Sequence, residues 1–144
     1  MSTCLEVYRY MTPCPQTIQR EASLASARAL MARYAVRHLP VLDGSDLVGI
    51  LSERDLAVAE RLGDPLEIVV ADAMSPEPCI AFPMTPLAEV AEQMIRHKYG
   101  AVLIVDRGSV IGVFTAVDAL RAVVELDATI QKNNAELGSG RRLA

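Results

Sequence analysis

The sequence predicts a mixed α/β (α+β) fold made of two similar β-α-β-β-α units. Residues 11–56 reappear at 74–119 with a constant shift of 63 positions and no gap. Within each copy, short apolar runs typical of strands alternate with stretches whose apolar residues recur every three or four positions, as in a half-buried helix. The chain has 144 residues, 51% of them apolar, which suits one shared core better than two independent domains. The two halves are therefore expected to pack on each other.

The repeat preserves the residue types that fix backbone conformation, which a chance match would not keep in register. The matched pairs include Met11 with Met74, Pro13 with Pro76, Gly49 with Gly112, and Asp55 with Asp118. A shift of this length is longer than the repeat of a solenoid. It therefore indicates a duplicated unit rather than a repetitive array.

In the first unit, an extended segment is expected at 16–18, followed by a helix from Ser23, whose hydroxyl can cap the first turn. Two apolar runs then flank Asp43-Gly44, a strong hairpin signal. A second helix begins after Ser52, another hydroxyl in the cap position.

The second unit repeats this order. An extended segment is expected at 79–81, and a helix starts at Thr85-Pro86, where a hydroxyl can cap and a proline is tolerated in the first turn. A hairpin over 102–114 follows, and the last helix begins after Thr115. The resulting division is an N-terminal segment (1–9), a first repeat (10–60), a linker (61–72), a second repeat (73–124), and a C-terminal helix with a frayed tail (125–144).

Composition excludes several classes of function. Fourteen basic and 18 acidic residues give a net charge of −4, so there is no cationic field for nucleic acid or for an anionic membrane. The charged residues Glu6 and Arg9 interrupt any signal peptide, and no apolar run is long enough to span a bilayer. Cys4, Cys14 and Cys79 form neither a disulfide framework nor a metal motif. We expect a soluble, cytoplasmic protein without a metal site.

Each hairpin is followed by the pattern G-h-h-[ST]-x-x-D, where h is apolar: Gly49 to Asp55 in the first unit and Gly112 to Asp118 in the second. A strand ends there, a hydroxyl caps a helix, and an acid follows within the first turn. A helix N-terminus favours an anion such as phosphate, and a carboxylate can accept hydrogen bonds from the two neighbouring hydroxyls of a ribose. The plainer interpretation is that each pattern is only a capping box. The duplication of the pattern favours a site that binds ribose and phosphate.

These features make the chain resemble a tandem pair of cystathionine-beta-synthase (CBS) domains, the arrangement called a Bateman module. The resemblance covers residues of about 10–56 and 73–120. It rests on the Met-x-Pro openings, on His38-Leu-Pro-Val41 and on both acid-bearing endings. It implies two units related by a pseudo-twofold axis, packed through their sheets, with two clefts for adenosine-containing ligands.

In that family each cleft is crossed, because the acid comes from one repeat and the strands that contact adenine come from the other. The first, preferred cleft would contain Thr17, Ile18, Val36, Arg37, His38, Pro40, Thr115 and Asp118. The second would contain Ile80, Ala81, Tyr99, Gly100, Ala101, Ser52, Arg54 and Asp55.

The two clefts are expected to differ in charge. Arg37 and His38 stand where the family places basic residues against phosphate, which needs such partners when it leaves water. The second cleft has Gly100-Ala101 at the matching positions, so only Arg54 and Lys98 could meet a phosphate there. The alternatives are that Arg37 and His38 form a solvated loop pair, and that Arg54 pairs on the surface with Glu53 or Asp55.

The resemblance therefore predicts a non-catalytic regulatory module that senses an adenine nucleotide, AMP first and ADP or ATP next. It would form a homodimer and signal to a regulated protein that the sequence does not identify. An interaction scaffold that has lost ligand binding is the second hypothesis. An enzyme ranks last, because Asp55 and Asp118 would belong to separate clefts and could not act together as acid and base. A redox role for Cys14 or Cys79, which lie near the unit openings, is left open.

Overall fold

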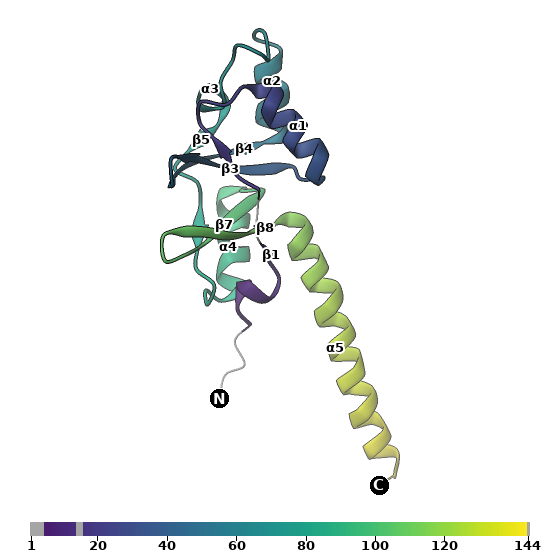
Figure 1. The fold of residues 1–144 in the computed structure, drawn as a ribbon. Coiled ribbons are helices and arrows are strands. Elements are labelled where there is room, and N and C mark those ends of the chain that lie inside the picture. Colours follow the sequence, from purple (N-terminus) through teal and green to yellow (C-terminus); the bar gives the residue numbers. More distant parts are fainter. Residues whose placement is uncertain (1–4, 14–15, 144) are drawn as a thin grey trace.

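The computed structural model describes residues 5–13 and 16–143, with side chains to residue 137. Two units are stacked along the long direction of the molecule, and the last helix runs away from them (Figure 1). The predicted α+β class and the β-α-β-β-α order of both units are confirmed.

The first unit contains a four-stranded sheet in the order β2-β3-β4-β5. Its strands and helices are β2 (Ile18–Gln19), α1 (Leu24–Tyr34), β3 (His38–Asp43), β4 (Asp46–Ser52) and α2 (Glu53–Glu60), followed by the short α3 (Val70–Ala73) and β5 (Ser75–Pro76). Strands β3 and β4 form the predicted hairpin, whose turn places Gly44 at a φ of +63°. This conformation is the one that glycine adopts without a steric cost.

The second unit contains the equivalent sheet in the order β1-β8-β7-β6. Its members are the 3-10 helix η1 (Val7–Arg9), β1 (Thr12–Pro13), β6 (Ile80–Ala81), α4 (Leu87–His97), β7 (Ala101–Asp106), β8 (Ser109–Thr115) and α5 (Ala116–Leu143). Thus α5 continues to Leu143, through the tail that the sequence predicts to be frayed. None of the helices in the described part of the chain has the length and apolar character needed to cross a bilayer.

The openings of the two repeats are exchanged between the units. Strand β1, from the start of the first repeat, pairs with β8 of the second unit, and β5, from the start of the second repeat, pairs with β4 of the first. The exchange begins earlier than the openings: Val7 is fully buried in the second unit's core and Val70 in the first unit's. These two valines are also 63 positions apart, so the structural repeat starts before the sequence pattern becomes visible.

The helix starts follow the predicted chemistry with one exception. Ser23 caps α1 by accepting the N–H of Ser26, and Ser52 caps α2. At α4 the residue in the cap position is Pro86, which has no side-chain hydrogen bond. The hydroxyl of Thr85 accepts the N–H of Phe82 instead. The expected hydroxyl cap at α4 is therefore wrong, because Thr85 stabilises the turn that precedes the helix.

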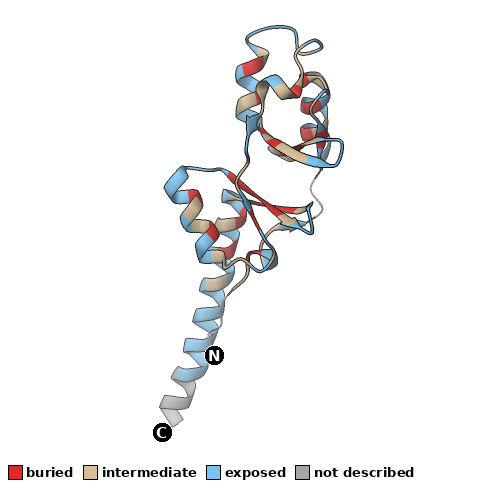
Figure 2. Ribbon diagram, turned by 90° about the vertical axis from the view of Figure 1, so that its left-hand side faces the viewer, coloured by how far each residue is buried: buried red, intermediate tan, exposed pale blue. Residues whose placement is uncertain are grey.

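Each unit has its own apolar core, and a third cluster joins the two sheets. Figure 2 shows buried residues in both units. In this joining cluster, Ala101, Leu103 and Val113 of the second sheet are buried against Leu47 and Ile50 of the first. The units therefore meet through their sheets, and the starts of β3 and β7 lie close to this contact.

Candidate functional site

The carboxylate of Asp118, at the start of α5, is buried with 3% of its surface exposed. Its Oδ2 accepts the N–H of Thr115 at 2.9 Å and the hydroxyl of Thr115 at 3.1 Å. Its Oδ1 accepts the hydroxyl of Thr12 at 3.1 Å and Nη1 of Arg121 at 3.1 Å. A buried carboxylate must be satisfied in this way, and here both oxygens are engaged.

The pattern does not reveal the role of Thr12, which comes from the opening of the first repeat, 106 positions away from Asp118. The exchange of β1 brings the two residues together. The hydroxyl in the Met-x-Pro segment is the one sequence feature that could have indicated this bond. Its partner can be identified only when it is known that β1 pairs with β8, which the sequence does not show.

Asp55, at the start of α2, is half-buried and less engaged. It forms a capping box: its Oδ2 accepts the N–H of Ser52 at 3.1 Å, and its own N–H donates to Oγ of Ser52 at 3.0 Å. Among the described residues, no donor bonds to Oδ1. The two acids thus share one local geometry and differ in how much hydrogen-bonding capacity is left for a ligand.

His38 lies where the two units meet. A Cβ atom added at Gly100 would lie 3.5 Å from Nε2 of His38, and the Gly100 carbonyl accepts the N–H of Ala116 at the start of α5. The mirrored bond joins the N–H of Glu53 to the carbonyl of Arg37. His38 and Gly100, which the resemblance assigns to different clefts, are therefore neighbours, and both helix starts lie close to them.

The surroundings of His38 lower the pKa of its imidazole. The main cause is burial, which disfavours the charged form. The positive charge of Arg37 acts in the same direction, whereas Asp55 and Glu53 oppose it. His38 is thus close enough to the acid of its own repeat to interact with it electrostatically.

The basic residues of the clefts are on the surface. The side chain of Arg37 is 80% exposed, and its Nε lies 3.7 Å from Oε2 of Glu53. The sequence offers Glu53 as a partner for Arg54, not for Arg37. Arg54 is exposed and has no ion pair with Glu53 or Asp55 in the described part of the chain. Lys98 ends α4 in the left-handed conformation, with a φ of 57°.

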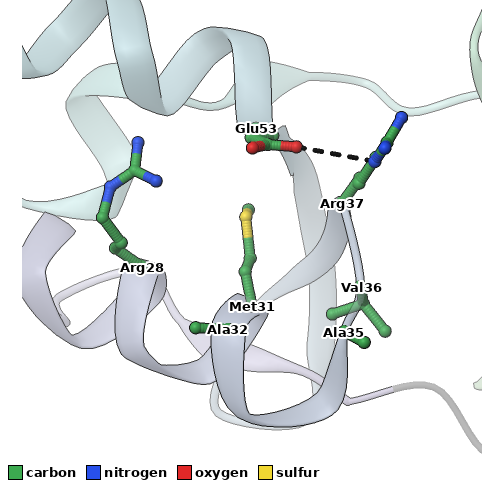
Figure 3. Close-up of a pocket in the computed structure, with 7 residues that line it drawn as sticks. All are labelled: Arg28, Met31, Ala32, Ala35, Val36, Arg37 and Glu53. Atoms are coloured by element: carbon green, nitrogen blue, oxygen red, sulfur yellow. Dashed lines mark ion pairs between the residues drawn. The ribbon is translucent and has the colours of Figure 1, made fainter.

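One hollow of about 320 Å³ lies between α1 and the beginning of α2. Arg28, Met31 and Ala32 line it from α1, Ala35, Val36 and Arg37 line it from the turn before β3, and Glu53 closes it (Figure 3). The side chains of Arg37 and Glu53 form an ion pair at its edge, while Arg28 binds Glu60. It contains two residues of the first predicted cleft, but neither Thr115 nor Asp118.

A second hollow of about 240 Å³ lies between β6 and α4. Ile80 and Ala81 of the second predicted cleft line it with Cys79, and Asp55 does not. Burial raises the pKa of the Cys79 thiol, which disfavours the reactive thiolate. Cys14, the other thiol considered for a redox role, lies outside the described residues.

The remaining predicted residues are divided between core and surface. Ile18, Pro40 and Ala101 are buried in strands, while Thr17 is exposed just before β2. Tyr99 is 42% exposed and stacks on His97, with 5.3 Å between the ring centroids. The structure therefore brings each acid together with its own hydroxyl, and it brings His38 to Gly100. Neither of the two hollows described above is lined by Asp55, Asp118 or His38.

The comparison with protein families gives a match over most of the chain. The family described as CBS domain matches residues 7–61 and 70–125. Among curated proteins, the chain is 34% identical over 103 residues to inosine-5′-monophosphate dehydrogenase of Korarchaeum cryptofilum, covering 71% of this chain and 21% of that protein. The Staphylococcus aureus enzyme is 31% identical over 113 residues, covering 76% and 22%. The chain spans about a fifth of these relatives, and the match lies in their CBS region, not in their catalytic domain.

Solved structures share the fold over nearly the whole chain. One is described as an acetoin utilization protein (AcuB) from Vibrio cholerae, with a TM-score of 0.79 and 28% identity, covering 90% of this chain and 97% of that one. Another is CBSX2 of Arabidopsis thaliana in complex with AMP, with a TM-score of 0.72 and 27% identity, covering 85% and 98%. Together with the family match to both repeats, these likenesses show that the chain belongs to the CBS-domain family and carries a tandem pair of CBS domains.

Proposed function

We propose that the chain is a non-catalytic regulatory module that binds an adenosine-containing ligand in the clefts between its two CBS domains. AMP is the first candidate, and ADP and ATP follow. The observation that carries this proposal is the paired hydroxyl and acid at the start of α2 and again at the start of α5. Each pair combines a helix N-terminus suited to phosphate with a carboxylate suited to ribose hydroxyls.

A related structure supports the choice of ligand. CBSX2, which is 27% identical and matches 85% of this chain, was solved in complex with AMP. The residues predicted for the second cleft also suit an adenine ring. Ile80 and Tyr99 offer exposed apolar and aromatic surface there. A purine ring can pack on such surfaces while its ribose reaches an acid.

The geometry ranks the two acids differently from the sequence. Charge at Arg37 and His38 favours the cleft of Asp118, but that carboxylate is already bonded to Thr12, Thr115 and Arg121. A ribose there must replace Thr12 and Arg121. Asp55 keeps Oδ1 available, so we propose that its cleft accepts ribose first. The Asp118 cleft would then fill when Arg121, whose side chain is 62% exposed, moves away.

Isothermal titration calorimetry with AMP, ADP, ATP and adenosine tests this proposal. The wild-type chain should bind at least AMP, and Asp55→Asn should weaken the tightest site by roughly tenfold or more, since each lost charge-assisted bond is worth about 1.5–3 kcal/mol. Asp46→Asn is the matched control, because Asp46 is an exposed acid in the hairpin turn. If no adenosine compound binds the wild-type chain, the proposed function is wrong.

The proposed signal is a change in the geometry of a homodimer, passed to a regulated protein that is still unidentified. A ligand held by the acid of one repeat and the strands of the other, as the family resemblance implies, would touch both units at once. Such a ligand can shift the arrangement only by binding one geometry more tightly than another. Dimerisation and a cytoplasmic location stay predictions from the sequence and the resemblance, and the sequence does not identify the regulated protein.

An interaction scaffold without a ligand is the second candidate. It is favoured by the saturated hydrogen bonds of Asp118 and by the two hollows, neither of which is lined by either acid. Thermal shift separates the candidates: a ligand at 100 times its Kd adds about 2.7 kcal/mol to the free energy of unfolding. A scaffold would melt at the same temperature with and without nucleotide.

A further inference from the structure

Residues 127–137 of α5 project away from the rest of the described chain. The helix runs from Ala116 to Leu143, 28 residues or roughly 40 Å, and projects away from both units (Figures 1 and 2). Its first turns pack on the second unit through Ala119 and Ala122. From Asp127 to Leu137 every described residue is exposed.

An isolated helix of this kind is only marginally stable in water. Short helices owe their stability mainly to packing of an apolar face, not to intrinsic propensity. The exposed half contains Thr129, Asn133 and Asn134, whose helix propensities are modest. Exposed apolar side chains remain at Val123 (62%), Ile130 (57%) and Leu137 (61%). A helix that persists there therefore needs a surface to cover this face.

The spacing of the exposed apolar residues of α5 indicates what kind of partner would cover them. Val123, Leu126, Ile130, Asn133 and Leu137, which we call the α5 seam, follow one another at steps of three, four, three and four. This is the heptad spacing of a coiled coil. Val123, Ile130 and Leu137 occupy one core position, and Leu126 and Asn133 occupy the other.

We propose that the α5 seam pairs with the same seam of a second copy of this chain, as a parallel, in-register two-stranded coiled coil. β-Branched residues at the first core position with leucine at the second favour two parallel strands, as at Val123, Leu126 and Ile130. An in-register copy also places Asn133 beside its counterpart, so each amide can bond to the other. This pairing accounts for a polar residue in an otherwise apolar seam.

The charges beside the seam permit this pairing. In a parallel pair the exposed residues flanking the seam meet as Thr129 with Asn134, and the position opposite Asp127 is the uncharged Ala122, which is buried on its own unit, so no like charges face each other. Within residues 127–137 the helix carries two acidic residues, Asp127 and Glu136, and one basic residue, Lys132, so this stretch does not offer the basic face that an anionic lipid surface attracts. The pairing gives the homodimer of the proposed function a defined contact, and it does not depend on an adenosine ligand.

Sedimentation equilibrium of the full chain tests the seam. The wild-type chain should dimerise reversibly, and Ile130→Glu should raise the dimer dissociation constant by roughly tenfold or more, because it puts a charge into the paired core. Ala128→Glu is the matched control: Ala128 is exposed two residues away, on the opposite side of the helix from the seam, and it should change the constant less than threefold. Equal effects of the two variants, or a monomeric wild-type chain, would overturn the proposal.

Disulfide trapping tests the orientation. In a chain whose three native cysteines are replaced by serine, Asn133→Cys should form a covalent dimer under mild oxidation much faster than Lys132→Cys, which faces outward. Comparable rates, or no covalent dimer from Asn133→Cys, would contradict a parallel, in-register pair. Both experiments are performed without nucleotide. A chain that binds no adenosine compound can therefore still pass them, and one that binds AMP can still fail them.

Discussion

Asp118 is expected to contribute more to stability than Asp55, although both occupy the same place in their repeats. Replacing Asp118 by alanine removes the acceptor of the N–H of Thr115, which is half-buried, and the acceptor of the hydroxyl of Thr12, which is exposed. A donor that is left unsatisfied away from water costs about 1–3 kcal/mol. Asp55→Ala removes a capping box that is partly open to water, at about 1 kcal/mol. Urea unfolding of both variants measures the difference, and a larger loss for Asp55→Ala would show that Asp118 does not help to hold the exchanged strand β1 on the second unit.

His38 should make the stability of the fold depend on pH. Its pKa is lower in the folded chain than in the unfolded chain, so the unfolded chain binds more protons in this range. The contribution of the neutral His38 to the free energy of unfolding is therefore fully present above the ordinary histidine pKa of about 6.5. It is lost as the pH falls from there toward the lower pKa of the folded chain. Burial is the main cause, with Arg37 acting in the same sense and Asp55 and Glu53 opposing it.

The measurement is the free energy of unfolding between pH 8 and pH 5 for the wild-type chain and for His38→Gln. The variant should lose less stability on acidification than the wild type. His97→Gln is the matched control, because His97 is the other histidine and is exposed. An unchanged pH profile for His38→Gln would mean that the imidazole gains a proton as easily in the folded chain as in the unfolded one.

For single residues, the sequence predicts contacts between positions that are close along the chain. The bonds between Ser52 and Asp55, three residues apart, follow from the geometry of a helix start and could be expected from the pattern. The bond from Thr12 to Asp118 could not, since it depends on which strand of the other unit accepts β1. The same limit applies to His38, whose neighbour Gly100 comes from the second repeat.

Among the elements, the exchanged openings explain the two repeated glycines. A Cβ added at Gly49 would lie 2.5 Å from Sδ of Met74 and 2.8 Å from the carbonyl oxygen of Ser75. At Gly112 the equivalent obstacles are Met11 and the carbonyl of Thr12, the latter at 3.0 Å. Each Met-x-Pro opening therefore lies directly over the glycine of the strand with which it pairs.

Gly49→Ala should consequently destabilise the chain by about 1–3 kcal/mol, the usual cost of overpacking. The methionine can move, but the backbone carbonyl of Ser75 is held in the sheet. Gly63→Ala is the control, because the added Cβ would approach only the flexible end of Ile68, at 3.1 Å. Thermal unfolding compares the two variants. Similar melting temperatures would show that β5 can leave β4 at little cost.

The hairpins and most helix starts could be predicted because their signals lie within a few residues of each other, as at Asp43-Gly44 and Ser23. The exchange could not, because a two-residue strand such as β1 or β5 carries no periodicity. The start of α4 shows a second limit. A hydroxyl beside a proline is consistent with a cap, yet Thr85 bonds backward to Phe82 and leaves Pro86 to begin the helix.

For the whole molecule, the exchange should make the two units unfold together. Each unit keeps its own core, but the buried Val7 of the second unit belongs to the first repeat, and Val70 of the first unit leads into the second repeat. The cluster of Leu103, Ala101 and Val113 against Leu47 and Ile50 adds a direct contact between the sheets. Along the chain, the first unit lies between β1 and the rest of the second unit, so its unfolding would lengthen the loop that brings β1 back to β8 and would expose the cluster that joins the sheets.

Differential scanning calorimetry tests this coupling. The wild-type chain should show one transition whose calorimetric and van't Hoff enthalpies agree. Leu103→Ala, in the contact between the sheets, and Leu56→Ala, in the core of the first unit, each remove a fully buried side chain and should cost about 2–5 kcal/mol. Both should lower the single transition without splitting it. A split profile for Leu56→Ala, with the second unit still folded, would show that the exchanged segments do not couple the units, and a ligand in one cleft would then have no route through the fold to the other.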